Sequence, residues 1–225
     1  MMKKNTGELL IVFYRNPIVG RVKTRLAATI GVENALRVYH WLIAHTRSIT
    51  QNLDMDVSVF YSDHIDYNDT WDNNLYQKQL QSGTDLGARM NGALIGSLGN
   101  VYESVCIIGT DCFELDPSII KQAFDDLRNH DSVIGPARDG GYYLIGFKGT
   151  PRDIFHDKNW GTSTVYDDTI SDFNNLGLNY SVLPILGDVD VESDLPPSIR
   201  NSIQNTIALQ DSFILNRILN RRWQI

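Results

Sequence analysis

Two patterns of apolar residues alternate along the chain and predict its strands and helices. Residues 8–14 and 104–109 each contain a continuous apolar run, which is typical of strands covered on both faces. Residues 32–51 and 86–98 instead carry apolar side chains at helical spacing. Similar reasoning predicts further strands at 55–62, 75–80, 132–136, 142–147 and 180–183, and further helices at 117–129, 165–176 and 197–222.

The alternation of strands and helices predicts an α/β fold with a mainly parallel central sheet and helices on both faces. No internal repeat, low-complexity tract or linker interrupts the chain, so we expect one domain over residues 1–225. Ligands of such sheets bind beyond the carboxyl ends of the strands. The best candidates for chemistry are therefore the polar residues that directly follow predicted strands.

Composition and charge exclude several classes of protein. The 225 residues carry a net charge of −7, which argues against binding to a nucleic acid polymer. The longest apolar run, residues 9–14, is far shorter than the ~20 residues of a membrane-spanning helix, so we expect no membrane insertion. The N-terminus does not read as a signal peptide, and Cys106 and Cys112 are too few for a disulfide framework. We therefore expect a cytoplasmic protein.

Positive charge is concentrated near the start of the chain, where it favours binding of a compact anion. Arg15, Lys23 and Arg25 lie where the first predicted strand ends and a helical stretch begins. Gly20 would let backbone N–H groups approach a ligand, and the basic side chains would complete a cradle for phosphate. The alternative is a solvated helix face, but such a face needs no Pro17 and Gly20 before it.

Two acidic residues that follow predicted strands are candidate metal ligands. Asp111 ends a buried strand beside a glycine, and a carboxylate there can reach a divalent cation from the rim of the sheet. Asp188 and Asp190 would share one side of an extended segment, where a cation would relieve their repulsion, and Asp190 is the stronger candidate. These residues could instead be acidic turn residues, and Asp194 is more simply a helix cap.

A pair of glycines joins two predicted strands. Gly140 and Gly141 could form a plain hairpin turn. They are preceded by Asp139 and followed by Tyr142, and the glycines could let a sugar or phosphate touch the backbone. Asp139 is then a candidate to orient or deprotonate an acceptor hydroxyl, with Gly140, Gly141 and Tyr142 as substrate-binding residues.

Two further segments are candidates for substrate contacts. Ser82 and Asp85 lie at a strand-to-helix junction, where such side chains could bind the base or ribose of a nucleotide. Asp85 could equally be a simple N-cap. Trp160 precedes a predicted helix and is either a buried core residue or a lid or stacking surface for the substrate.

Taken in order, these motifs resemble those of a bacterial family of nucleotide-diphosphosugar transferases, the radical-SAM and selenodomain-associated glycosyltransferases. The resemblance implies a single GT-A-like domain, a basic loop that holds phosphates, and Mg²⁺ or Mn²⁺ held by Asp111 and Asp190. Phe113 stands where many relatives have proline, and Val191 where related nucleotidyltransferases often have threonine. The matching segments are residues 15–26, 85–90, 109–112, 135–146 and 188–190.

The resemblance and the motifs together indicate a metal-dependent transferase that uses a nucleotide-activated donor. We expect glycosyl transfer from a nucleotide sugar to a small acceptor, with Lys23, Arg25 and Asp139 as the catalytic residues. The alternative is a nucleotidyltransferase, similar to guanylyltransferases, that joins a nucleoside triphosphate to a phosphorylated substrate and releases pyrophosphate. A second alternative is a nucleotide-binding module without catalysis. The base, the sugar and the acceptor stay open, as does a homodimer.

Overall fold

The computed structural model describes residues 6–98, 101–149 and 154–204. By its internal contacts the chain divides into two compact units. The sheet unit comprises Met1–Pro17 and His40–Asp188, and the helical unit comprises Ile18–Tyr39 and Val189–Ile225. The expectation of a single domain over residues 1–225 stays a prediction.

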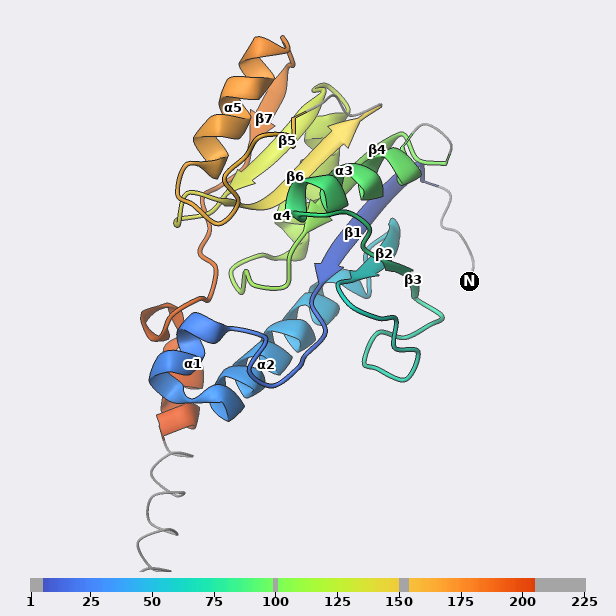
Figure 1. Ribbon diagram of the computed structural model, residues 1–225. Coiled ribbons are helices and arrows are strands. Elements are labelled where there is room, and N and C mark those ends of the chain that lie inside the picture. The colour runs from blue at the N-terminus through green and yellow to red at the C-terminus, as the bar shows by residue number, and fades with distance from the viewer. Residues whose placement is uncertain (1–5, 99–100, 150–153, 205–225) are drawn as a thin grey trace, which may run out of the picture. The chain divides into compact units, whose positions relative to one another are not determined.

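The sheet unit is built on one seven-stranded sheet, which Figure 1 shows with its strands labelled. Only β6 runs antiparallel to its neighbours, so the predicted α/β fold with a mainly parallel sheet is confirmed. The carboxyl ends of the other six strands therefore lie at one edge, the carboxyl edge. In spatial order the strands are β3 (Tyr76–Leu80), β2 (Asp56–Tyr61), β1 (Glu8–Tyr14), β4 (Ser104–Ile108), β6 (Tyr142–Lys148), β5 (Ser132–Pro136) and β7 (Tyr180–Val182).

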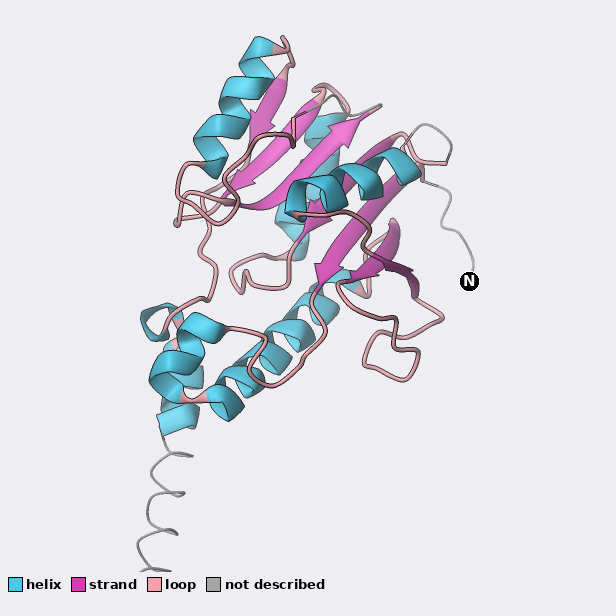
Figure 2. Ribbon diagram, in the orientation of Figure 1, coloured by secondary structure: helices cyan, strands magenta, loops and turns pink. Residues whose placement is uncertain are grey.

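Helices cover both faces of this sheet (Figure 2). α3 (Leu86–Ser97) and α5 (Val165–Asn175) contribute to the main apolar cluster on one face, together with Ile107 of β4 and Phe147 of β6. α4 (Pro117–Leu127) packs on the other face, where Leu127 approaches Gly146 so closely that a Cβ on this glycine would lie 3.3 Å from it.

Local sequence explains several element boundaries. The Asp116 carboxylate accepts the N–H groups of Ser118 and Ile119 at 2.7 and 3.2 Å, which caps α4 as the Asp-Pro pair predicts. β2 carries polar residues between apolar ones, yet it is buried along its whole length and leaves no exposed face. Its polar residue Asp56 is instead paired inside the unit, because the Tyr102 hydroxyl donates to it at 3.0 Å.

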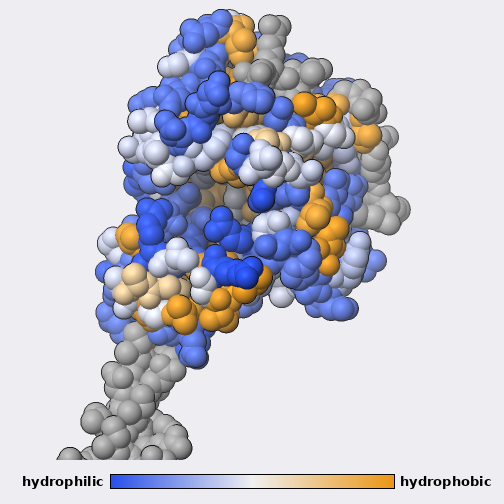
Figure 3. Space-filling view, in the orientation of Figure 1, coloured by the Kyte–Doolittle hydropathy of each residue, from blue (hydrophilic) through white to orange (hydrophobic). Residues whose placement is uncertain are grey.

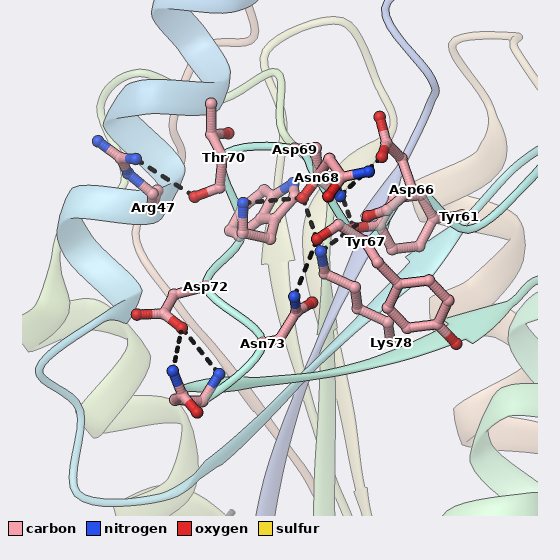
Figure 4. Close-up of polar contacts among 12 residues, drawn as sticks. Arg47, Tyr61, Asp66, Tyr67, Asn68, Asp69, Thr70, Asp72, Asn73 and Lys78 are labelled. Atoms are coloured by element: carbon pink, nitrogen blue, oxygen red, sulfur yellow. Dashed lines mark hydrogen bonds and ion pairs between the residues drawn. The ribbon is translucent and has the colours of Figure 1, made fainter.

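A buried lysine holds the loop between β2 and β3 (Figure 4). The Lys78 side chain is 2% exposed, and its ammonium donates to the Asp69 carboxylate at 2.7 Å and to the Asp66 carbonyl at 2.8 Å. The Tyr61 hydroxyl donates to the same carboxylate at 2.6 Å. The ammonium also lies 5.9 and 5.8 Å from the ring centres of Tyr61 and Tyr67. These contacts keep a polar loop in one conformation.

The helical unit contains α1 (Thr24–Ile30), the first residues of α2 (Val32–Thr50), the short 3₁₀ helix η1 (Glu192–Asp194) and a helix over 197–204. Gly31, at φ 82°, separates α1 from α2. Leu26, Ile30 and Leu195 are among its buried residues, and α1 contacts η1. The helix predicted over 197–222 is confirmed as far as residue 204, and the remainder lies outside the described residues.

The face drawn in Figure 3 is mainly hydrophilic, with apolar residues in separate patches. Among the residues that the structure describes, no helix is long and apolar enough to cross a membrane.

Candidate functional site

The basic residues near the start of the chain meet an acidic residue near its end, within the helical unit. The Lys23 ammonium lies 3.1 Å from Oδ1 of Asp190, and the Arg25 guanidinium lies 2.5 Å from Oδ2 of the same carboxylate. The Lys23 side chain is 4% exposed, Asp190 27% and Arg25 67%. Two predicted phosphate ligands and one predicted metal ligand are therefore brought together.

The turn before α1 gives these side chains their positions. The Arg21 N–H donates to the Ile18 carbonyl at 3.0 Å, and Gly20 takes φ 75°, which glycine adopts without strain. Lys23 is the N-cap of α1 and has φ 48°, a left-handed conformation that is uncommon for lysine. The backbone at Lys23 is thus held in an unfavourable conformation while its side chain is buried against Asp190.

Asp194 fixes the backbone that carries Asp190. Its carboxylate accepts the N–H groups of Asp190 and Val191 at 3.0 and 2.8 Å. Arg200 donates to three carbonyls of the same segment, those of Glu192, Ser193 and Leu195. Asp194 therefore has a structural role, as its alternative interpretation suggests, although it caps the turn before it rather than the helix after it.

Three other predicted motifs come together at the carboxyl edge of the sheet unit. Asp111 follows β4, and the next residue, Cys112, forms an antiparallel bridge with Asp188. The Glu114 carboxylate accepts from Arg138 at 2.8 Å and from the N–H of Gly187 at 3.1 Å. The loops after β4, β5 and β7 are thereby joined to one another.

Glu114 was not among the residues that the sequence singled out for a role. Its pKa is lowered chiefly by the hydrogen bond from Arg138. Gly187 is required beside this pair, because a Cβ there would lie 2.3 Å from a nitrogen of the Arg138 guanidinium. The available signal was a charged residue three positions after Asp111, which is too common a pattern to assign a partner.

The glycine pair forms a hairpin turn that is packed against the start of α5. β5 and β6 pair antiparallel, and the Asp139 carboxylate accepts the N–H of Gly141 at 2.9 Å. A Cβ on Gly140 would lie 2.1 Å from the Ser163 carbonyl oxygen, so only glycine fits. The hairpin interpretation is confirmed. The roles of Asp139, Gly140, Gly141 and the partly buried Tyr142 toward substrate stay predictions.

The remaining predicted residues lie on two further segments of the sheet unit. Asp85 caps α3 by accepting the Ala88 N–H at 2.9 Å, a bond that lowers the pKa of Asp85. Ser82, in the loop before it, is exposed, and Arg15 is exposed after β1. Trp160 stacks on Phe155 with ring centres 6.5 Å apart and belongs to the partly buried residues around the main core.

The carboxylates of the described residues could hold Mg²⁺ or Mn²⁺ only together with water or substrate oxygens as further ligands. No group of three or more His, Cys, Asp and Glu side chains that could hold a metal ion is found among residues 6–98, 101–149 and 154–204. Mg²⁺ commonly takes one or two carboxylates and leaves its other positions to water and substrate phosphates. Asp111 and Asp190 each offer one carboxylate, and their role as metal ligands stays a prediction.

Comparison with solved structures supports the same fold. A protein from Desulfovibrio desulfuricans G20, proposed to be a nucleotide-diphospho-sugar transferase, is 27% identical over 96% of this chain and 98% of its own, with a TM-score of 0.77. The bifunctional IspDF from Campylobacter jejuni shares the fold at 11% identity, over 84% of this chain and 53% of its own, with a TM-score of 0.51.

The search of curated proteins gave no significant match. A family model, described as "Uncharacterized protein conserved in bacteria (DUF2064)", matches residues 45–162, which is more than half of the chain. The chain therefore belongs to the DUF2064 family.

Proposed function

We propose that the chain is a transferase that uses a nucleotide-activated donor together with Mg²⁺ or Mn²⁺. The observation that carries the proposal is the convergence of Lys23 and Arg25 on one anionic group, the Asp190 carboxylate. Two cations aimed at one compact anion suit a diphosphate. The likeness to the Desulfovibrio protein supports the same class of substrate.

In this proposal the residues of the chain bind and orient the two reactants. Lys23 and Arg25 hold the diphosphate and stabilise the negative charge that develops on the leaving phosphate. A divalent cation, when bound, supplies further neutralisation of that charge. From their sequence motifs, Asp111 and Asp190 would hold it. Asp139 would orient the acceptor hydroxyl and accept its proton.

Glycosyl transfer is the first choice among the reactions that these parts can support. The resemblance of the motifs to the radical-SAM and selenodomain-associated glycosyltransferases and the similarity to the Desulfovibrio protein both favour it. Nucleotidyl transfer is the second choice, because Arg15, Arg21, Lys23 and Arg25 are enough cations for three phosphates. A module that binds nucleotide without catalysis is the third outcome of the test below.

Thermal unfolding in the presence of nucleotides separates these functions. The protein is heated with a panel of nucleoside triphosphates and nucleotide sugars, each with and without Mg²⁺ or Mn²⁺. A ligand at a hundred times its Kd stabilises the native state by about 2.7 kcal/mol, which raises the Tm of a chain of this length by roughly 5 to 10 °C. A larger shift with a nucleotide sugar than with any triphosphate supports glycosyl transfer. The reverse order supports nucleotidyl transfer.

Two variants and a control connect the shift to the assigned residues. Lys23→Gln should abolish the stabilisation, and Asp111→Asn should abolish the part of it that depends on the cation. Glu192→Gln should leave it unchanged, because the Glu192 side chain makes no ion pair with any residue that the structure describes. Binding without release of product would support the non-catalytic module, and no shift with any nucleotide would contradict the proposed function.

A further inference from the structure

We propose that Asp190 acts as an internal anion, which occupies the place of the substrate diphosphate between Lys23 and Arg25 until the diphosphate displaces it. The inference rests on the proposed function for the class of ligand. It adds that ligand binding at this position is an exchange of one anion for another. The Asp190 carboxylate therefore lowers the affinity of the site for phosphate.

The geometry of the three side chains supports an exchange of anions. The carboxylate gives one oxygen to each cation, Oδ1 to Lys23 at 3.1 Å and Oδ2 to Arg25 at 2.5 Å. Two non-bridging oxygens of a phosphate group present acceptors to two donors in the same manner. Arg25 is mostly exposed, so its side of the ion pair is open to an incoming anion.

The burial of Lys23 favours an acidic partner beside it. Its side chain is only 4% exposed, and an ammonium removed from water without a counter-charge is costly. Asp190 supplies this counter-charge in the free protein, and the phosphate would supply it in the complex. The lysine is then paired in both states.

The displacement breaks the two ion pairs of the Asp190 side chain and leaves the hydrogen bonds of its backbone in place. Asp194 holds the backbone N–H groups of Asp190 and Val191 through its own carboxylate, and this contact does not involve Lys23 or Arg25. After displacement Asp190 has lost both cationic partners. A divalent cation that arrives with the diphosphate would replace them, so the cation and the diphosphate should favour each other's binding.

A purely structural ion pair differs from this proposal in its response to the ligand. If Asp190 only linked η1 to α1, pyrophosphate would bind without displacing it, and residues 189–194 would stay as firmly held as in the free protein. If the anion takes the place of the carboxylate, the segment loses this link. The two interpretations therefore differ in the change that pyrophosphate causes in the hydrogen exchange of residues 189–194.

A first experiment titrates sodium pyrophosphate into the protein by calorimetry, without divalent cations and at about 0.15 M ionic strength, where charges farther away than the ion pair are largely screened. Asp190→Asn should bind pyrophosphate roughly three- to tenfold more tightly than the unmodified protein, as expected for release of a partly buried ion pair. Glu192→Gln removes one negative charge two residues away and should leave the affinity within about twofold. Equal or weaker binding by Asp190→Asn would overturn the proposal.

Hydrogen exchange on the unmodified protein gives an independent test, which does not depend on the folding of a variant. Pyrophosphate without metal should speed amide exchange in residues 189–194, because this segment opens more often once the Asp190 side chain no longer ties it to Lys23 and Arg25. It should slow exchange in residues 20–27, which contact the anion. Unchanged or slower exchange in 189–194 would overturn the proposal.

The outcome can be told apart from a failure of the proposed function. Tighter pyrophosphate binding by Asp190→Asn, with no nucleotide that stabilises the protein, would keep the anion exchange and reject the nucleotide substrate. Nucleotide binding with no effect of Asp190→Asn on pyrophosphate affinity would keep the nucleotide substrate and reject the anion exchange.

Discussion

The Glu114 carboxylate joins two loops of the carboxyl edge through two different oxygens. One oxygen accepts from Arg138 after β5, and the other accepts the backbone N–H of Gly187 after β7. Because Glu114 itself lies in the loop after β4, its side chain contacts all three loops and adds to the backbone bridge between Cys112 and Asp188. Such a residue positions the surroundings of Asp111 without contacting a ligand in the proposed reaction.

We expect Glu114→Gln to lower stability at neutral pH but not in acid. The Arg138 hydrogen bond lowers the pKa of Glu114 below its usual 4.5. A carboxyl with a lowered pKa stabilises the fold above pH 4.5, and this contribution is lost as the pH falls through the folded-state pKa. Both side chains are largely exposed, so the loss at pH 7 should be at most about 1 kcal/mol. Urea unfolding at several pH values, with Glu192→Gln as control, measures it. A constant difference down to pH 3 would contradict this account.

We expect both cysteines to resist thiol reagents in the native state. Cys106 is 0% exposed and Cys112 7% exposed. Burial raises the pKa of both thiols, that of Cys112 to about 12, and the thiolate is the reactive form. A colorimetric disulfide reagent at pH 8 should label neither residue within minutes, and both once denaturant is added. Rapid labelling of native protein would show that this part of the sheet unit opens.

At the scale of elements, the distance from a helix to the neighbouring segment determines which side chains fit on the helix. Gly87 lies in the first turn of α3, and a Cβ there would be 2.4 Å from the Phe155 carbonyl oxygen and 2.7 Å from the Trp160 ring. Gly96, near the end of the same helix, faces open space. Packing therefore requires glycine at position 87 of this helix but not at position 96.

This difference gives a matched pair of substitutions. Gly87→Ala should destabilise the protein by about 1 to 3 kcal/mol, because the segment with Phe155 and Trp160 must move. Gly96→Ala should be neutral or stabilise it by up to about 1 kcal/mol, because alanine favours helix. Chemical unfolding followed by circular dichroism measures both. Equal effects of the two substitutions would contradict the packing of Trp160 on α3.

The loop between β2 and β3 depends on the buried ion pair of Lys78 with Asp69. Lys78→Met would leave the Asp69 carboxylate without its buried cation, and we expect a loss of about 3 kcal/mol. Lys121→Met serves as control, because Lys121 lies on the exposed face of α4 and its replacement should change stability by less than about 0.5 kcal/mol. A similar small effect at Lys78 would mean that the ion pair is not needed to hold the loop.

At the scale of the whole molecule, the sequence predicts the order of elements much better than their pairing. Each strand and most helices have a periodicity or a cap of their own, so β1, β5 and α4 are found close to their predicted limits. The pairing of Lys23 with Asp190 joins residues 167 positions apart. No local pattern indicates such a pair, and the sequence suggested separate ligands, a phosphate and a metal, for its two members.

The same reason explains what the sequence left open about the candidate site. Asp85 accepts the Ala88 N–H as the cap of a helix, and Asp139 accepts the Gly141 N–H within a turn, as their local sequence predicts. The left-handed backbone of Lys23 and the division into two compact units depend on the complete chain. Local chemistry can therefore be predicted from the sequence, while long-range pairing cannot.

The most direct test of the proposed function is a crystal structure with Mn²⁺ and the nucleotide that stabilises the protein most. The account predicts the diphosphate on Lys23 and Arg25, with the Asp190 carboxylate no longer bound to either. It also predicts an anomalous manganese peak on the Asp111 carboxylate. A nucleotide whose phosphates lie away from Lys23 and Arg25, or manganese bound only to other residues, would contradict it.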